Sequence, residues 1–426
     1  MTQELPQTGN LTPKLAWWRE FSDSTLDSLI EKALKQNHSL GSTLESVEQS
    51  RLILKQQTAL KAPLVDLSLN TGVEKASSSQ RSTSKDVTLD VKYEIDLWGR
   101  LSALEAESLW NYQASIEEVK IQANTIASNV TTHWYRWIAA KEGLKLLDKQ
   151  INDTEKRLSL AELRYSVGQQ RSSAILQEKE LLKSLNRTRI SIETDRNLAR
   201  TNLALWINEL PENLPIPKEE ALPHLVSITH YKVGPGQIID RPDVEKNLAL
   251  LNASKSALKA TALNRYPNLN LTASSVFSGD AYRSILTQIT GSILLPLTDG
   301  GHRKAETNIS HSKMNQAIHN YQNSVQAASV EIINSIRWDL DRQSTVVQIE
   351  EELGILKQLE RMQVQEYQSG LIRFEDVLDT QRRTSSIQKT LLDTRLNWIE
   401  RRINFFRSVS SGPDIYELIS RGDKLE

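Results

Sequence analysis

The chain has no cysteine, little glycine and proline, and no long apolar run. Because none of its 426 residues is cysteine, disulfides, thiol catalysis and cysteine-ligated zinc are all excluded. Only 16 glycines and 12 prolines leave few loops for a chain of this length. No segment approaches the roughly 20 apolar residues that a transmembrane helix needs. These absences favour a helical protein, but they say little about membrane strands, whose alternating pattern is a weaker signal.

Neither sign of charge is in excess, because 52 basic residues balance 53 acidic ones. A net charge of -1 and the lack of a basic tail argue against a nucleic-acid partner. The seven histidines are scattered, and no phosphate-binding loop, nucleophile elbow or HExxH motif occurs. The sequence therefore predicts no enzyme, no catalytic residues, no cofactor and no metal site.

The segment Met1–Glu4 has neither a basic region nor an apolar core, so no export signal is predicted. Two interpretations stay open at this point. The protein is cytosolic, or the sequence is a mature segment that has been given a new start codon.

The most informative feature of the chain is an internal duplication at an offset of 202 residues. The segment Tyr165–Gly168 with Arg171 returns as Tyr367–Gly370 with Arg373. Each half reads as helix, strand, strand, very long helix, turn and helix. Five of the twelve prolines fall within 208–240, which marks an irregular linker between the halves. The pattern indicates two pseudo-symmetric halves rather than a solenoid array.

Apolar residues recur every seven positions along each predicted long helix. In the first half they are Leu109, Ile116, Ala123, Val130, Trp137, Leu144, Ile151, Leu158 and Tyr165. In the second half they are Ile318, Val325, Ile332, Val346, Leu353 and Tyr367, interrupted by Asp339 and Glu360. Such sustained heptads predict long helices packed side by side. Trp134, Trp137 and Trp338 are predicted to be core residues.

Four stretches alternate apolar and polar residues, which is typical of strands with two different faces. The clearest is 86–98, with Val87, Leu89 and Val91 on one face and Thr88 and Asp90 on the other. Their lengths fit tilted strands crossing a bilayer. Four strands are too few for a membrane barrel, but a dimer supplies eight and a trimer twelve. The alternative is a soluble α+β protein whose sheet packs on its own helices.

Several motifs then resemble one family, the TolC-type outer-membrane efflux proteins (outer membrane factors), and within it the OprM-like branch. The motifs are Tyr93–Arg100, Arg241–Asp243, Leu295–Gly301, Tyr367–Gly370 and Asp376–Asp379. The resemblance covers nearly the whole chain, and the order and spacing of the motifs carry it. It implies an internally duplicated α+β membrane protein that forms a homotrimer. Each chain would contribute long helices to an α-helical barrel and four strands to a 12-stranded β-barrel.

The resemblance also implies a location and partners. The protein would lie in the outer membrane of a Gram-negative bacterium, in contact with outer-membrane lipid, and extend into the periplasm. A periplasmic adaptor (membrane fusion) protein and an inner-membrane pump would be its partners. The family commonly has a signal peptide and often a lipid-modified cysteine, neither of which this sequence contains.

By the same resemblance, function resides at the two helix-turn-helix tips. Val167, Gly168, Gly370 and Leu371 are the predicted adaptor-docking residues, and Tyr367 and Arg373 are predicted polar residues of the gate region. Asp376 and Asp379 match the acidic constriction of the family's second repeat. Each would form a ring of three carboxylates in a trimer, where like charges at close range attract cations. The first repeat has Ala174 and Gln177 at the matching places, so an ion pair using an acid there is not expected.

The predicted organisation has five segments. They are an N-terminal equatorial segment (1–24), a first repeat (25–207), a Pro-rich equatorial linker (208–240), a second repeat (241–409) and a C-terminal equatorial tail (410–426). The first repeat has a helix to residue 61, strands 64–74 and 86–98, and helices 99–165 and 173–207. The second repeat has a helix, strands 268–277 and 284–297, and helices 300–366 and 374–408.

The predicted function is that of a passive trimeric exit duct in a tripartite efflux system, carrying drugs or other small toxic compounds. Two alternatives are retained: a type I protein-secretion duct of the same fold, and a soluble coiled-coil scaffold.

Overall fold

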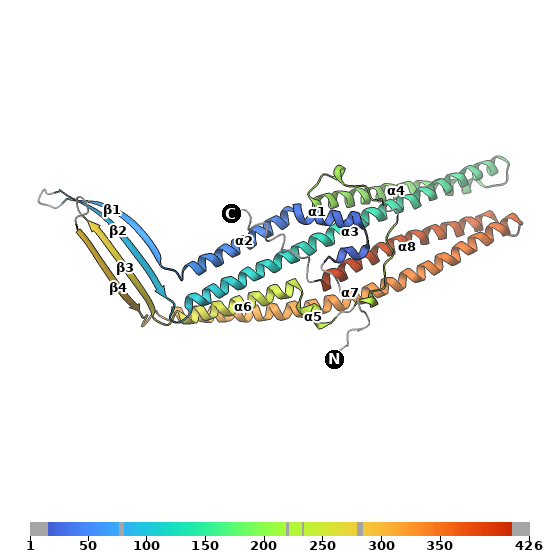
Figure 1. The fold of residues 1–426 in the computed structure, drawn as a ribbon. Helices are drawn as coiled ribbons and strands as arrows, with labels where there is room; N and C mark the ends of the chain where they lie inside the picture. The colour runs from blue at the N-terminus through green and yellow to red at the C-terminus, as the bar shows by residue number, and fades with distance from the viewer. Residues whose placement is uncertain (1–15, 76–80, 219–220, 232–233, 279–283, 411–426) are drawn as a thin grey trace. The chain divides into compact units, whose positions relative to one another are not determined.

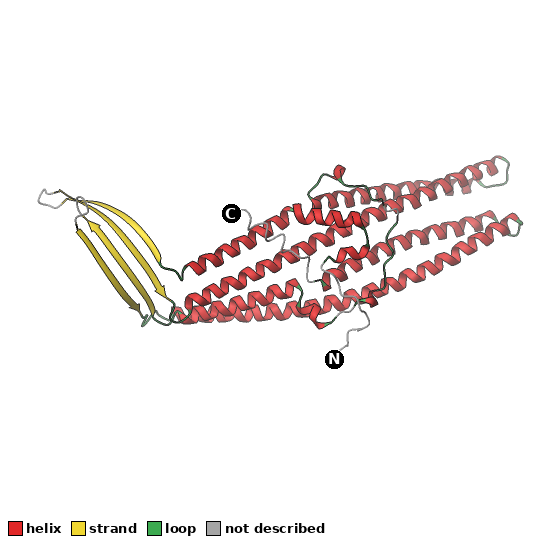
Figure 2. Ribbon diagram, in the orientation of Figure 1, coloured by secondary structure: helices red, strands yellow, loops and turns green. Residues whose placement is uncertain are grey.

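The structure is a computed structural model, and it describes residues 16–75, 81–218, 221–231, 234–278 and 284–410 (Figure 1). Long helices dominate it, together with four strands (Figure 2). None of the helices in these ranges combines the length and the apolarity that a membrane crossing requires.

The two halves of the chain have the same order of elements. The first contains α1 (Ser24–Gln36), α2 (His38–Ala59), β1 (Leu64–Lys75), β2 (Arg81–Ile95), α3 (Arg100–Ser166) and α4 (Ser172–Ile207). The second contains α5 (Pro235–Ile239), α6 (Pro242–Leu263), β3 (Asn268–Ser278), β4 (Ser284–Leu294), α7 (His302–Gln368) and α8 (Phe374–Val409). Three short 3-10 helices, Trp17–Phe21, Pro211–Asn213 and Ile228–His230, lie outside the repeated elements. Because α3 and α7 both have 67 residues and α4 and α8 both have 36, the duplication extends to element length.

The helix expected over 25–61 is divided at Asn37, which has an extended backbone conformation. The Asn37 side-chain oxygen accepts hydrogen bonds from the amides of Ser39 (2.9 Å) and Leu40 (3.2 Å) and so caps α2. Its amide nitrogen donates to the carbonyl oxygen of Trp206 at 2.8 Å. Asparagine is a strong N-cap residue, because its side chain satisfies backbone donors that lack helical partners. A new helix therefore begins at His38.

Two predicted strands end earlier than expected because an aspartate that follows each of them caps the next helix. Strand β2 spans 81–95 rather than 86–98, and the Asp96 carboxylate accepts from the amides of Leu101 and Ser102, both at 2.8 Å. Strand β4 ends at residue 294 rather than 297, and the Asp299 carboxylate accepts from the amides of Gly301 (3.0 Å) and Arg303 (3.1 Å). The two caps occupy equivalent places in the two halves.

The four strands form one antiparallel sheet in the order β1-β2-β3-β4. The register aligns Val65, Val91, Ala273 and Ile289 in one row across the sheet. The next row is polar and contains Asp66, Asp90, Ser274 and Gln288. Since successive residues of a strand point to opposite faces, the apolar and polar faces predicted from the alternation are confirmed. Leu67, Leu69, Ile289 and Ile293 on the apolar face are all more than 70% exposed.

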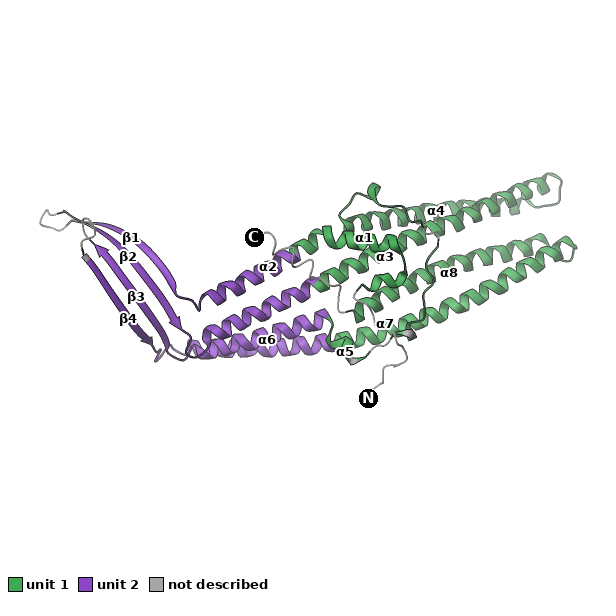
Figure 3. Ribbon diagram, in the orientation of Figure 1, with its two compact units in different colours: residues 1–42, 120–241, 327–426 green, residues 43–119, 242–326 purple. Residues whose placement is uncertain are grey.

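The chain forms two compact units, which are coloured separately in Figure 3. One contains residues 1–42, 120–241 and 327–426, and the other contains 43–119 and 242–326. The sheet and its flanking helical segments belong to the second unit. Both helical hairpin turns belong to the first unit.

An aromatic cluster forms the core of the first unit. Trp17 stacks on Phe406 of α8 at 5.9 Å between ring centroids, and Phe21 packs against Tyr135 of α3 at 5.2 Å. Tyr231 of the linker meets the Phe406 ring edge-on at 5.3 Å. Segments that are distant in the sequence are thereby held on α3 and α8 by apolar burial and ring contacts.

The heptad stripe is buried in the part of this unit farther from the hairpin turns, and Val130, Trp134 and Trp137 are core residues as predicted. Toward the first turn the stripe becomes half-buried at Leu158 and exposed at Tyr165. The prediction for Trp338 is wrong. Its side chain is 47% exposed, with the Arg401 guanidinium 4.9 Å above the ring. The next residue, Asp339, occupies the heptad position and is fully buried, so the apparent interruption belongs to the core.

Candidate functional site at the two hairpin turns

The turns that join α3 to α4 and α7 to α8 have the same backbone geometry. Gly168 and Gly370 both have a φ of 75°, in the left-handed region that a residue with a Cβ enters at a cost. The Gly168 amide donates to the carbonyl of Tyr165, and the Gly370 amide donates to that of Tyr367, both at 3.0 Å. Glycine in this conformation terminates a helix by satisfying carbonyls of its last turn. The repeated Tyr-x-x-Gly motif is therefore a helix stop.

A contact between the two halves lies just behind these turns. The Arg164 guanidinium donates to the Tyr367 hydroxyl and also lies 5.0 Å from the centroid of the Phe374 ring. Tyr367 and Phe374 pack together, with their ring centroids 5.2 Å apart. Arg164 belongs to α3, while its two partners belong to α7 and α8. One cation therefore connects the first hairpin to both helices of the second.

A second contact between the halves uses the carboxylate of Glu178 on α4. Its oxygens accept from Arg382 of α8 at 2.7 Å and from Arg157 of α3 at 3.3 Å. Glu178 is only 5% exposed. A carboxylate this deeply buried requires ionic or hydrogen-bonding partners, and here two guanidinium groups supply them. The Glu178 cluster, comprising Arg157, Glu178 and Arg382, thus joins three helices.

The two predicted constriction residues lie on the first turns of α8 in different surroundings. A carboxylate oxygen of Asp376 accepts from the backbone amide of Arg373 at 3.1 Å, so this side chain caps its own helix. Asp379 has a more exposed side chain, and its carboxylate lies 3.5 Å from Arg382. Asp379 therefore adjoins the Glu178 cluster, whereas Asp376 is engaged with the turn.

The predicted docking residues at the turns are exposed. Val167 is 62% exposed and Leu371 is 75% exposed. Gly168 and Gly370 lie beside them, and a Cβ added at either glycine would meet no atom within 4 Å. Each turn therefore presents one apolar side chain beside an open stretch of backbone. Arg373, predicted as a polar gate residue, is likewise exposed.

Among the described residues, no group of three or more His, Asp or Glu side chains has the arrangement of a metal site. The tips carry ion pairs, hydrogen bonds and exposed apolar side chains.

Glu178, Arg382, Arg164 and Phe374 were not identified from the sequence. The equivalents of Asp376 and Asp379 in the first repeat are Ala174 and Gln177, and the acid that forms the ion pair lies one residue beyond Gln177. A usable signal existed. Glu178 is seven residues before Leu185, and that spacing continues to Ile192 and Ala199. A single acid within an apolar heptad stripe indicates a buried ion pair.

Residues 29–209 and 238–409, most of the chain, match the family described as outer membrane efflux protein. The chain belongs to this family. The pyoverdine export outer membrane protein OpmQ of Pseudomonas aeruginosa is 24% identical over 93% of this chain and 87% of its own length. The probable outer membrane lipoprotein SilC of Salmonella typhimurium is also 24% identical, over 93% of this chain and 88% of that protein.

Among solved structures, the CmeC outer membrane channel of Campylobacter jejuni shares the fold of this efflux protein. The TM-score is 0.88 at 18% identity, and the alignment covers all of this chain and 93% of the other. Family and fold together make the protein an efflux duct of the outer membrane. The hypothesis of a soluble scaffold is set aside.

Proposed function

We propose that this outer membrane efflux protein is the passive, trimeric exit duct of a tripartite system. A periplasmic adaptor and an inner-membrane pump are its partners, and drugs or other small toxic compounds are its cargo. The observation that carries the proposal is the isolated four-stranded sheet, whose large apolar side chains are exposed on one face. Exposed apolar area of this kind marks a surface that lipid or protein covers. Three copies would supply twelve strands, with the apolar face toward lipid and the Asp66–Asp90 row toward the lumen.

The hairpin turns are the gate in this proposal. Arg164 with Tyr367 and Glu178 with Arg382 hold the two hairpins of one chain together near their tips. Separation of the hairpins must break both contacts, so they stabilise the closed state. Asp376 and Asp379 form the carboxylate rings of the constriction, and Asp379 couples that ring to the Glu178 cluster.

The exposed turn residues Val167, Gly168, Gly370 and Leu371 form the docking surface for the adaptor. The proposal includes no catalytic step, because the contacts at the tips bind and release without making or breaking covalent bonds. The energy for export comes from the pump.

Conductance across a planar bilayer tests the duct. Purified protein should insert from one side and give discrete current steps, whereas a preparation that binds the bilayer without conducting would contradict the proposal. If the protein instead serves type I secretion, deletion of its gene should remove a secreted protein from the culture medium. Drug tolerance should then be unchanged.

Docking is tested by crosslinking, for which a chain without cysteine is a clean background. Val167→Cys and Leu371→Cys should crosslink to a co-expressed adaptor through a short thiol-to-amine reagent. Leu205→Cys is the matched control, because Leu205 on α4 is 73% exposed and lies far along the helix from the turn. Equal crosslinking from all three positions would refute docking at the turns.

A further inference from the structure

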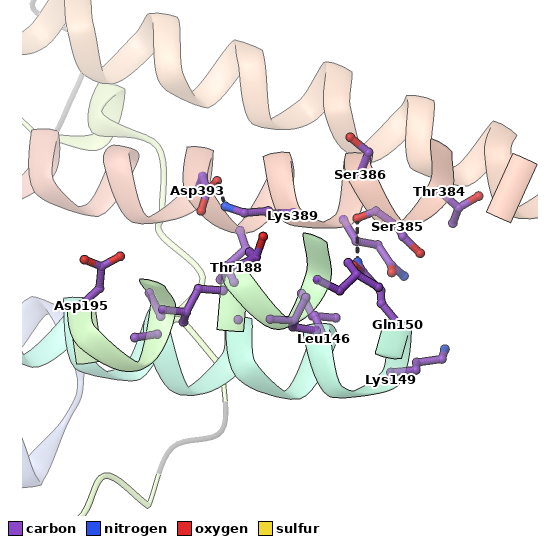
Figure 4. A pocket seen from close by; sticks show the side chains of 18 of the residues that line it. Leu146, Lys149, Gln150, Thr188, Asp195, Thr384, Ser385, Ser386, Lys389 and Asp393 are labelled. Atoms are coloured by element: carbon purple, nitrogen blue, oxygen red, sulfur yellow. Dashed lines mark hydrogen bonds and ion pairs between the residues drawn. The ribbon is translucent and has the colours of Figure 1, made fainter. Parts of the chain in front are cut away.

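A long cavity of about 930 Å³ lies between α3, α4 and α8 within the first unit (Figure 4). His133 and Asn202 line one end, and Arg157 and Arg382 line the other. Its volume is at the upper end of the range for small-molecule sites.

The floor of the cavity is apolar and is made by all three helices. Leu147 belongs to α3, Leu185 and Ile192 belong to α4, and Leu392 belongs to α8. The helices converge at Gly143, where an added Cβ would lie 3.6 Å from a Leu392 methyl and 3.8 Å from an Ile192 methyl. Glycine at this position leaves the floor open, since a larger side chain would project into it.

The dimensions of the cavity limit what it can admit. His133 and Arg157 are 24 residues apart on α3, which corresponds to about 36 Å at the helical rise. The cavity is therefore long enough for an extended hydrocarbon chain.

The charges around the rim are mostly compensated by their neighbours. Lys389 pairs with Asp393 at 2.7 Å, Arg136 pairs with Glu400 at 2.7 Å, and Arg157 and Arg382 share Glu178. Lys357 and Glu360, which carry opposite charges, lie three residues apart on α7.

Asp195 is the exception at the end near His133. Its carboxylate has no hydrogen bond or ion pair within the described residues, and in Figure 4 it points into the space between α4 and α8. Lys149, near the other end, extends away from that space. The open end therefore offers one uncompensated negative charge above an apolar floor.

We propose that this cavity binds a single-chain amphiphile with a cationic head. The hydrocarbon chain lies along Leu147, Leu185, Ile192 and Leu392, and the head is held by the Asp195 carboxylate. Burial of apolar surface is favourable in proportion to the area removed from water, so chain length sets the affinity and Asp195 selects the head group. Arg157 and Arg382 belong both to the cavity lining and to the Glu178 cluster, so the inference rests on the proposed arrangement in which the two hairpins are held together.

Titration calorimetry with decyltrimethylammonium, below its micelle concentration, tests the proposal on the full-length protein in lipid nanodiscs. The heat of binding to empty nanodiscs is subtracted. Gly143→Leu should raise the dissociation constant at least tenfold, because its side chain fills the floor. Gly354→Leu is the matched control: Gly354 lies in α7 of the same unit with no atom near its Cβ position, and it should bind as the unmodified protein does.

Asp195→Asn tests the head group without altering the floor. It should weaken decyltrimethylammonium binding roughly three- to tenfold and leave decyl sulfate binding no weaker. Unchanged binding by Gly143→Leu would overturn the site, and equal affinity for decyl sulfate in the unmodified protein would overturn the choice of a cation. If Gly143→Leu fails to assemble, an unchanged affinity in Asp195→Asn overturns the proposal by itself.

Discussion

Glu178 and Arg382 are 204 residues apart in the chain, and their side chains meet at 2.7 Å. The acid comes from the first repeat and the base from the second. Breaking a buried ion pair from one side leaves an uncompensated charge, which usually costs more than the pair contributes.

Glu178→Gln should therefore destabilise the hairpin region. We expect a loss of about 1–3 kcal/mol, below the usual range for buried pairs because Arg382 is partly exposed. Thermal unfolding followed by circular dichroism measures the stability, and single-channel recording should show a larger open fraction. The control is Glu193→Gln on the same helix, whose pair with Arg189 is exposed and should contribute less than about 0.5 kcal/mol.

The Asp339–Arg402 pair offers a test of whether a buried ion pair stabilises the fold at all. Both side chains are almost fully buried, and two N–H groups of Arg402 bind the carboxylate at 2.7 and 2.9 Å. Arg402→Met should lower the free energy of unfolding by about 3–5 kcal/mol, because it leaves the buried Asp339 carboxylate without a partner. The double variant Arg402→Met/Asp339→Leu should recover most of that loss in urea unfolding. A double variant as unstable as the single one would show that the pair itself is stabilising.

The two turn glycines should be equally intolerant of a side chain. Gly168→Ala and Gly370→Ala each force alanine into the left-handed region, which should lower the free energy of unfolding by about 1–2 kcal/mol. Gly354→Ala should instead stabilise by about 0.5–1 kcal/mol, because that glycine lies inside a helix with free space around it. Melting temperatures of the three variants give the comparison, and a neutral effect at either turn would contradict the backbone argument.

Asp379→Asn should reduce block of the duct by a multivalent cation added from the periplasmic side. The carboxylate is exposed and does not cap its helix, so the fold should be unaffected. The cation concentration that halves the current should rise at least tenfold. Asp376→Asn is a poorer test, since it also weakens the hydrogen bond to the Arg373 amide.

Stability should fall in mild acid because of His133. Burial, together with the nearby Arg136, lowers the pKa of its imidazole in the folded state. The unfolded chain then binds the proton more readily, so stability is complete above the unfolded pKa of about 6.5 and falls as the pH drops toward the folded value. His133→Gln should flatten this part of the profile of melting temperature against pH, while His311→Gln, on an exposed helix face, should not.

Much of the fold could be predicted from the sequence, because hydrophobic period is a local signal and the duplication presents the same order of elements twice. The alternation in β2 and β3 was sufficient to assign both faces of the sheet. Element ends were less predictable, since Asn37, Asp96 and Asp299 act through single capping hydrogen bonds that hydrophobic periodicity does not reveal.

The candidate site was only half predictable. The turn glycines and the acids of α8 follow recognisable motifs, whereas Glu178 and Arg382 depend on which helices become neighbours. Trp338 shows the same limit, because a shift of one residue around a helix exchanges a core position for a surface one. Glu178 in the α4 stripe and Asp339 in the α7 stripe each break the apolar pattern and each form a buried ion pair.

The shared φ of Gly168 and Gly370 has a consequence for how the tips part. The two bends are mechanically alike, so any difference between the hairpins must arise from the side chains that restrain them. Only the second bend has its own acidic cap, from Asp376, while the first depends on partners borrowed from the other repeat. Loss of the borrowed contacts would release the first hairpin while the second kept its shape. In the proposed trimer, the three first hairpins would then move before the three second hairpins, and the proposed gate would open in two steps.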